Sequence, residues 1–123
     1  MSVSTIKMTG NSCRTFTSTL GTSQFTLNRQ RCFQDGHRVV MSFDATANNA
    51  ISTGSTMPLL LVPSELAPSE DLAGLGWVSN GTNFSIGYAK VFKNGNNYYV
   101  GQNVYGTISS GTKLSIYCEY YID

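Results

Sequence analysis

Regular alternation of apolar and polar residues is the clearest pattern in the chain. In residues 37–45, Val39, Met41, Phe43 and Ala45 form one apolar face, and every second residue is apolar again over residues 113–122. A period of two that is kept over eight or more residues predicts a β-strand with one buried face. In the second run Cys118 shares the apolar face, whereas Tyr117 and Tyr121 lie on the opposite one. We therefore expect two long, half-buried strands and a buried Cys118.

Shorter runs of the same kind, separated by turn-forming residues, predict further strands. They cover residues 15–19, 24–28, 57–62, 76–78, 83–93 and 97–103. The dipeptides Asp35-Gly36, Asn80-Gly81 and Asn94-Gly95 are typical of tight hairpin turns, because these residues accept a positive φ. The chain therefore holds about eight strands, with no internal repeat and no linker.

Two stretches depart from plain alternation. Within residues 83–93, Lys90 falls among the aromatic positions of one face, which indicates a β-bulge at Gly87. Residues 63–71 are the only stretch that predicts a helix, and the prolines within it limit the helix to one turn.

These elements predict an all-β protein, an antiparallel two-sheet sandwich of the jelly-roll kind with about eight strands. A chain of 123 residues is long enough for one core, so we expect a single domain over residues 1–123. Fifty residues are Ser, Thr, Asn or Gly, and only 15 are charged. A helical bundle would contain more Ala, Glu, Lys and Leu, and a disordered chain fewer apolar residues than the 41% found here.

Charge and cysteine content limit the partners and the compartment. A net charge of +1 gives no basic surface for nucleic acid, and no apolar window approaches the 18 residues of a membrane span. Residues 1–5 lack the apolar core of a signal peptide, so a cytosolic product and the mature start of an exported protein both stay open. We expect Cys13, Cys32 and Cys118 to be reduced, small hydrophobic residues; the alternative is one bridge from Cys13 or Cys32 to Cys118.

Residues that support catalysis are few. His37 is the single histidine and directly follows a predicted turn, where a surface position is expected. The candidates for a paired-carboxylate glycosidase site are Glu65, Glu70 and Asp71. They lie in a proline-bounded loop, where we expect the carboxylates to be solvated. The motifs of serine hydrolases, zinc proteases and nucleotide-binding loops are absent. We expect no enzyme activity, no catalytic residue, no cofactor and no metal.

Aromatic residues supply binding chemistry instead. Six tyrosines fall within residues 98–121, and tyrosine suits both protein interfaces and sugar stacking. Tyr117 and Tyr121 either cover the second side of the sandwich or pack against another subunit. Trp77, the only tryptophan, is either a core residue or a platform beside an amide-lined pocket.

Neutral ligands such as sugars are held by aromatic stacking and by hydrogen bonds from amides, hydroxyls and carboxylates. The candidate ligand-binding residues are Trp77, Asn80, Asn83 and Tyr98, followed by His37 and Asp35. The candidate subunit contacts are Tyr117 and Tyr121.

The order of these elements resembles that of a known protein family. In sequence there are a charged strand, a glycine turn before Val39-Val40-Met41-Ser42-Phe43, a proline-marked crossing at residues 57–63, an Asn94-Gly95 hairpin and an aromatic-aliphatic strand at residues 114–122. Over residues 26–122 the chain is similar to the C-terminal head domains of bacteriophage tail-fibre and baseplate receptor-binding proteins. The resemblance lies in the order of strands and turns, so it carries over no ligand residue. The three cysteines and the proline-rich insert depart from the family pattern.

The resemblance implies a compact β-sandwich that forms a homotrimer, joins the rest of the tail or baseplate and recognises a host cell-surface saccharide or surface protein. Such a protein is made in the bacterial cytoplasm and works in the virion tail, and residues 1–25 are then a candidate link to an upstream fibre. Two other classes stay open. One is a structural trimerisation or tip module without its own receptor site. The other is a secreted lectin-like jelly roll, which glycans at Asn80 or Asn83 would favour.

Overall fold

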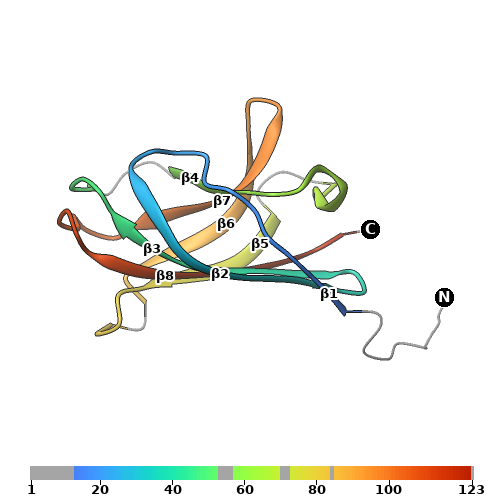
Figure 1. Cartoon of the computed structure of the whole chain (residues 1–123), viewed down its shortest axis with the longest axis horizontal. Coiled ribbons are helices and arrows are strands. Elements are labelled where there is room, and N and C mark those ends of the chain that lie inside the picture. The colour runs from blue at the N-terminus through green and yellow to red at the C-terminus, as the bar shows by residue number, and fades with distance from the viewer. Residues whose placement is uncertain (1–12, 53–56, 70–72, 84, 123) are drawn as a thin grey trace.

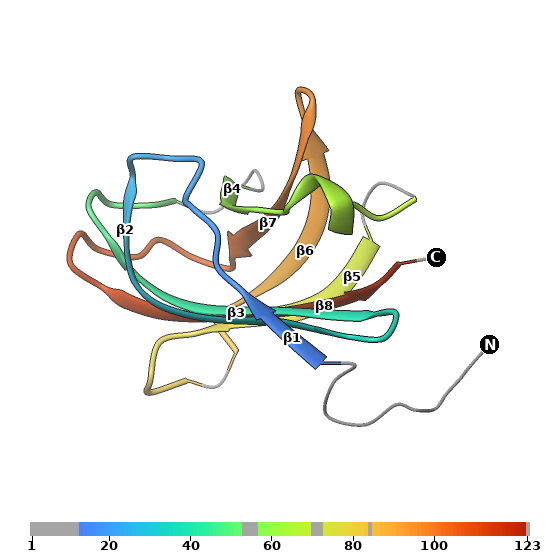
Figure 2. The same ribbon diagram turned by 45° about the vertical axis from the view of Figure 1, so that its right-hand side comes forward.

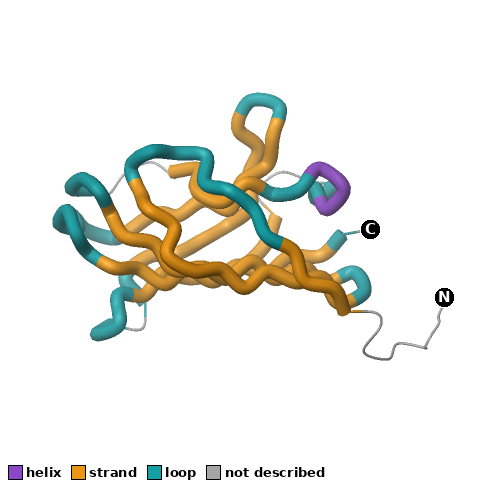
Figure 3. The backbone as a smooth tube through the Cα atoms, viewed as in Figure 1, coloured by secondary structure: helices purple, strands orange, loops and turns teal. Residues whose placement is uncertain are grey.

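The computed structural model describes residues 13–52, 57–69, 73–83 and 85–122, whose arrangement is shown in Figures 1 and 3. The elements are β1 (Cys13–Phe16), β2 (Phe25–Asp35), β3 (Arg38–Ala47), β4 (Met57–Leu61), the 3-10 turn η2 (Ser64–Leu66), β5 (Ala73–Ser79), β6 (Gly87–Asn94), β7 (Asn97–Val104) and β8 (Lys113–Tyr121). All eight strands form one sheet in the order β1-β2-β3-β8-β5-β6-β7-β4. The sheet curls until β4 and β7 lie across the core from β3 and β8 (Figure 1). The expected all-β antiparallel fold is confirmed, and its two layers are joined in one continuous sheet.

The chain that follows β1 joins the two edges of the sheet. The backbone N–H of Leu61, on the edge strand β4, donates to the Thr19 carbonyl oxygen at 2.9 Å. The Gln30 amide holds the same segment, because its Nε2 donates to Ser18 O at 2.9 Å and its Oε1 accepts from Ser18 N at 2.8 Å. Figure 2 shows this segment crossing from β1 towards β4. Residues 17–21 thus cover a strand edge that would otherwise be open to pairing with another chain.

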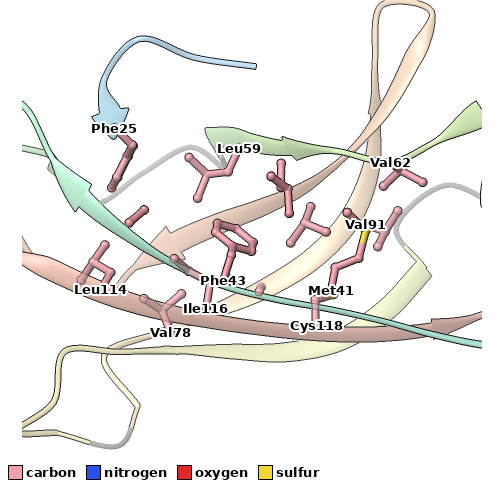
Figure 4. Close-up of a cluster of buried hydrophobic side chains, with 14 of the residues drawn as sticks. Phe25, Met41, Phe43, Leu59, Val62, Val78, Val91, Leu114, Ile116 and Cys118 are labelled. Carbon is pink, nitrogen blue, oxygen red and sulfur yellow. The ribbon is translucent and has the colours of Figure 1, made fainter. Parts of the chain in front are cut away.

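Apolar side chains fill the space inside the curl. Figure 4 shows Phe43 of β3 between Leu59 of β4 and Ile116 of β8, and all three are at most 2% exposed. Burial of each such side chain contributes about 1.5–3 kcal/mol. Cys118 lies in the same core, as the alternation predicts, and burial raises the pKa of its thiol to about 12.

The cysteines occupy two different environments. Cys32 is buried like Cys118, and burial raises the pKa of its thiol to about 11. Both thiols are therefore protonated and unreactive in the folded protein. Cys13 is reduced as expected, but it is exposed at the start of the edge strand β1, so it does not pack as a small hydrophobic residue. All three are free thiols, and the alternative of a bridge to Cys118 is not found.

Register shifts occur in three strand pairs. They lie between Leu27 and Arg29, between Pro58 and Leu60, and between Ala73 and Gly76. The expected bulge at Gly87 is wrong, since β6 begins there and pairs with β7 without a shift as far as Asn94. Lys90 shares the outer face with Tyr88 because the two are two residues apart in a regular strand, and its ammonium lies over the Tyr88 ring, 5.6 Å from the centroid.

Two of the three predicted tight turns are present. Gly36 begins the β2–β3 turn with φ 63°, and Gly95 begins the β6–β7 turn with φ 69°. Asn80-Gly81 is not such a turn, because the β5–β6 pairing ends at Val78 and Gly87 and leaves a longer loop. The predicted helical turn is confirmed by η2, whose Leu66 carbonyl accepts a buried 2.8 Å hydrogen bond from the Tyr120 hydroxyl.

The N-terminal part of the fold differs most from the prediction. Strand β2 continues to Asp35, although the alternating run ends at Asn28. Beyond that residue the side chains that point outwards are mostly polar, so a strand and an exposed loop give the same sequence pattern. Residues 13–25, part of the candidate fibre link, belong to the described fold. Within the described ranges no helical segment has the length and hydropathy of a membrane span.

Candidate ligand-binding face

Trp77 and Tyr117 form a stacked pair on the outer face of the sheet, which is turned away from the core. Strands β5 and β8 pair so that Trp77 lies directly opposite Tyr117. Their ring centroids are 4.6 Å apart and the ring planes differ by 17°. Trp77 is partly exposed, whereas its neighbour Val78 is fully buried, because successive residues of a strand point to opposite faces. The alternative that Trp77 is a core residue is therefore wrong.

A glycine next to Trp77 brings the two strands close together. A Cβ atom on Gly76 would overlap the carbonyl oxygen of Tyr117 and lie 2.8 Å from Cys118 Cα. No side chain fits in this space without moving the backbone of β8. Gly76 thus sets the distance between β5 and β8 at the point where the two rings stack.

A hydrogen-bond network fixes the Tyr117 ring. Its hydroxyl donates to Glu119 Oε1 at 2.6 Å, and Arg38 Nη2 lies 3.5 Å from the hydroxyl and 3.4 Å from the same carboxylate oxygen. The hydrogen bond from Tyr117 and the nearby guanidinium hold the pKa of Glu119 below its ordinary value. Desolvation, followed by the bond to Glu119, raises the pKa of Tyr117. The tyrosine therefore stays neutral and keeps its orientation beside Trp77.

Polar side chains form the next cross-strand row on the same face. Asp44 of β3 is opposite Ser115 of β8, and Ser115 is opposite Ser79 of β5. Ser115 Oγ donates to Asp44 Oδ1 at 2.9 Å, and Arg29 Nη2 lies 2.9 Å from Asp44 Oδ2. This row is two residues along each strand from the aromatic pair, which corresponds to about 6.6 Å.

An open pocket of about 510 Å³ lies beside the polar row. Its walls include Asn28, Asp44, Asn80, Lys113 and Ser115. A volume of this order accepts a small ligand, and the walls combine amide, hydroxyl, carboxylate and ammonium groups. The pocket therefore offers donors and acceptors within reach of the aromatic pair.

Asn80 and Asn83 lie together in the β5–β6 loop. Asn80 Oδ1 accepts hydrogen bonds from the backbone N–H groups of Thr82 at 3.0 Å and Asn83 at 2.8 Å. This Asx turn explains why Asn80-Gly81 begins a loop rather than a two-residue hairpin. Asn80 is the predicted residue that lines the pocket, whereas Asn83 is exposed outside it.

The other predicted ligand residues lie far from the aromatic pair. Tyr98 lies near the tip of the β6–β7 hairpin, which projects from the body in Figure 1, and Lys93 Nζ is 6.0 Å from its ring centroid. Asp35 and His37 lie exposed at the β2–β3 turn, at the opposite end of the sheet from the β5–β6 loop (Figure 2). The structure therefore divides the predicted residues among three separate regions.

The two candidate subunit contacts share the outer face of β8. Tyr117 is partly covered by its stacking partner, whereas Tyr121 is 64% exposed and lies opposite Arg38. Leu75, also on the outer face, is 72% exposed. Contact with another subunit through these side chains stays a prediction.

Asp44, Tyr88 and Ser115 of this face were not among the predicted site residues. Tyr88 of β6 lies opposite Trp77, and its ring centroid is 6.4 Å from that of Tyr105. The only sequence signal for all three is their place in alternating strands. That signal indicates the outward-facing side but does not distinguish a ligand-binding row from an ordinary solvated one.

Acidification should loosen the stacked pair. A carboxyl whose folded pKa is lowered stabilises the fold above its ordinary pKa, and this contribution is lost as the pH falls through the folded value. We therefore expect a change in Trp77 fluorescence as the pH falls below the ordinary pKa of a glutamate, because Glu119 then takes up a proton and its bond to Tyr117 weakens. Fluorescence titration of the wild type and Glu119→Gln tests this, since the variant should lack the transition. Identical acid titrations of the two proteins would contradict it.

Comparison of the chain with protein-family models, curated proteins and solved structures gave no match. In the described part of the chain, no group of three His, Cys, Asp or Glu side chains is placed to hold a metal ion. Of the three carboxylates considered for catalysis, Glu65 is exposed in η2, and Glu70 and Asp71 lie outside the described residues. The aromatic pair with the adjacent polar pocket is therefore the feature on which a function can rest.

Proposed function

We propose that the protein is a non-enzymatic receptor-binding head of a bacteriophage tail, which holds a host cell-surface saccharide against the outer face at Trp77 and Tyr117. The observation that carries this proposal is the stacked aromatic pair beside a pocket of amide, hydroxyl and carboxylate groups. The resemblance in strand and turn order supports the phage assignment. It implies a homotrimer joined to the rest of the tail or baseplate, made in the bacterial cytoplasm and carried in the virion tail.

The chemistry of the face suits a sugar ring. A pyranose has an apolar C–H surface that packs on aromatic side chains and a rim of hydroxyls that needs hydrogen-bond partners. The polar row lies about 6.6 Å from the aromatic pair, within the length of one ring. Asp44 already forms an ion pair with Arg29 and accepts a hydrogen bond from Ser115, but an ionised carboxylate has about four lone-pair positions and can accept more.

Trp77→Ala should reduce binding to bacteria without unfolding the protein. Loss of one aromatic contact of about 1.4 kcal/mol corresponds to a tenfold weaker affinity. The fold should persist because Trp77 lies outside the core and is partly exposed. The test is adsorption of the labelled domain to a panel of intact bacteria and to their purified wall polysaccharides.

Two variants serve as controls for this experiment. Trp77→Phe keeps a stacking ring and should retain most of the adsorption, whereas His37→Ala changes an exposed residue at the far end of the sheet and should have no effect. Circular dichroism verifies the fold, and light scattering gives the oligomeric mass. A folded monomer that binds neither cells nor polysaccharide would overturn the proposal. If Trp77→Ala adsorbs as strongly as the wild type, the aromatic pair is not part of the receptor-binding site.

Two exposed side chains favour a second candidate, a structural trimerisation module without its own receptor site. Leu75 and Tyr121 lie on the same outer face and are 72% and 64% exposed. Large exposed apolar side chains that lie together often mark a protein interface. A trimer in solution that adsorbs to no bacterium or polysaccharide would support this candidate over the first.

A further inference from the structure

A second pocket is lined by residues of the β1–β2 connection, of the chain after β3, of the start of β4 and of β7. Figure 2 shows the first three of these segments at one end of the curled sheet. We propose that this pocket is a separate binding site for a neutral, hydroxyl-bearing small molecule, which donates a hydrogen bond to the side-chain carbonyl of Gln102. The pocket encloses about 480 Å³ and is open to solvent on one side. It shares no lining residue with the pocket beside Trp77 and Tyr117, so the two proposals stand independently.

Gln102 is the observation that points to a ligand. It lies on β7 opposite Ala89 of β6 and Met57 of β4, and its side chain, 1% exposed, lines the pocket. Its Oε1 is buried and accepts no hydrogen bond from any described residue. A buried amide oxygen without a partner is costly, and most such atoms in folded proteins are satisfied.

Other glutamines of the same protein show the usual outcome. Gln30 uses both ends of its amide on the backbone of Ser18, and Gln34 accepts from Arg14 and donates to the Gly36 carbonyl. These side chains are less buried than Gln102, yet they are fully engaged. Among the buried side-chain atoms of the described residues, the Oε1 of Gln102 is the one without a hydrogen bond, and Gln102 is one of the residues that line the pocket.

The composition of the walls selects the chemistry of the ligand. None of the ten lining residues is charged. A carbonyl oxygen only accepts hydrogen bonds, so the ligand has to donate one. Anionic ligands and ammonium ligands are both disfavoured, because the pocket walls hold no residue of opposite charge. Thr22, Gln24 and Ser52 add polar groups, while Ile51 and Met57 add apolar wall. A polyol or a sugar of one or two rings meets these conditions and fits the volume.

The test is a titration of the whole ¹⁵N-labelled domain with three probes, namely glycerol, methyl β-glucoside and maltose, followed by amide chemical shifts. We expect saturable shifts at residues 21–24, 50–52 and 102–104, with a Kd on the order of 1 mM. Saturation by the glucoside or maltose but not by glycerol identifies a sugar ring as the ligand. Saturation by glycerol alone identifies a small free polyol.

Gln102→Met is the decisive variant, because it keeps the volume of the side chain and removes the carbonyl. We expect at least about tenfold weaker binding, together with an unchanged or higher Tm, since the variant no longer buries an unsatisfied oxygen. Ala50→Phe fills the pocket from its exposed rim and gives an independent variant should Gln102→Met fail to fold.

Glu65→Gln is the matched control, because Glu65 is exposed in η2 and does not line the pocket, and this variant should bind the probes as the wild type does. The absence of saturable shifts at residues 21–24, 50–52 and 102–104 with all three probes would overturn the proposal. So would shifts of wild-type size in both pocket variants, or a crystal soaked in the probes that shows only an ordered water on Gln102 Oε1. None of these results bears on adsorption to bacteria, so failure here is distinguishable from failure of the proposed receptor-binding function.

Discussion

Gly76→Ala is expected to destabilise the domain by about 3 kcal/mol or more, at the upper end of the usual cost of overpacking. The added methyl group would overlap the Tyr117 carbonyl oxygen and lie 2.8 Å from Cys118 Cα, both of them backbone atoms that cannot rotate away. Strand β5 would have to move from β8, and the Trp77–Tyr117 stack would open. Urea denaturation gives the loss of stability. Near-ultraviolet circular dichroism reports on the stack through the single tryptophan.

Gly106→Ala is the matched control for this experiment. A Cβ atom on Gly106 would meet no other atom within 4 Å, so its stability should change by less than about 0.5 kcal/mol. If the two variants were equally stable, the close approach of β5 and β8 at Gly76 would be disproved. Loss of stability at Gly76 with an unchanged Trp77 spectrum would show that the stack does not depend on this spacing.

Phe43→Ala should cost about 3–5 kcal/mol, the range found when a buried phenylalanine is truncated. Phe43 is 2% exposed and lies between the two layers of the curled sheet, β3 with β8 on one side and β4 with β7 on the other (Figure 4). The cavity left by its removal therefore has walls on both sides and cannot easily collapse. A loss of this size is a large part of the 5–15 kcal/mol that stabilises a typical domain. Chemical denaturation followed by far-ultraviolet circular dichroism measures it.

Phe33→Ala provides the comparison on the outer face. Phe33 is partly exposed, and its ring centroid lies 5.8 Å from the Arg38 guanidinium carbon. Its removal should cost only about 1 kcal/mol, from a surface cation–π contact and a small buried area. If Phe43→Ala and Phe33→Ala lost the same free energy of unfolding, the core would not lie between the two layers of the curled sheet.

The alternating pattern predicted β3 and β8 well because each of these strands has one buried face. It correctly assigned Cys118 to the core and Tyr117 to the outer face. It failed where both sides of a strand carry polar residues, as in the second half of β2. It also predicted a β-bulge because Lys90 falls among aromatic positions of one face. A lysine can share a face with aromatic residues, however, when its ammonium lies over one of their rings.

The candidate site could be predicted only in part, because it depends on strand pairing. Trp77 and Tyr117 are far apart in the sequence and meet only because β5 pairs with β8, a non-local choice that residue spacing does not encode. Asp44 and Ser115 join them for the same reason. Gln102 gave no signal at all, since an amide in an alternating strand is equally compatible with an exposed position.

Strand β8 is the last of the eight described strands along the sequence, yet it occupies the middle of the sheet, between β3 and β5. The β2–β3 and β6–β7 hairpins each pair strands that are neighbours in the sequence. They are joined only through β8, which pairs with β3 on one side and with β5 on the other, and β5 in turn pairs with β6. A nascent chain on the ribosome therefore exposes the apolar faces of both hairpins until residue 121 has emerged. Folding is completed only after synthesis of the last strand, on the millisecond-to-second scale typical of such non-local sheets. During that interval the chain depends on rapid closure, or on chaperones, to avoid aggregation.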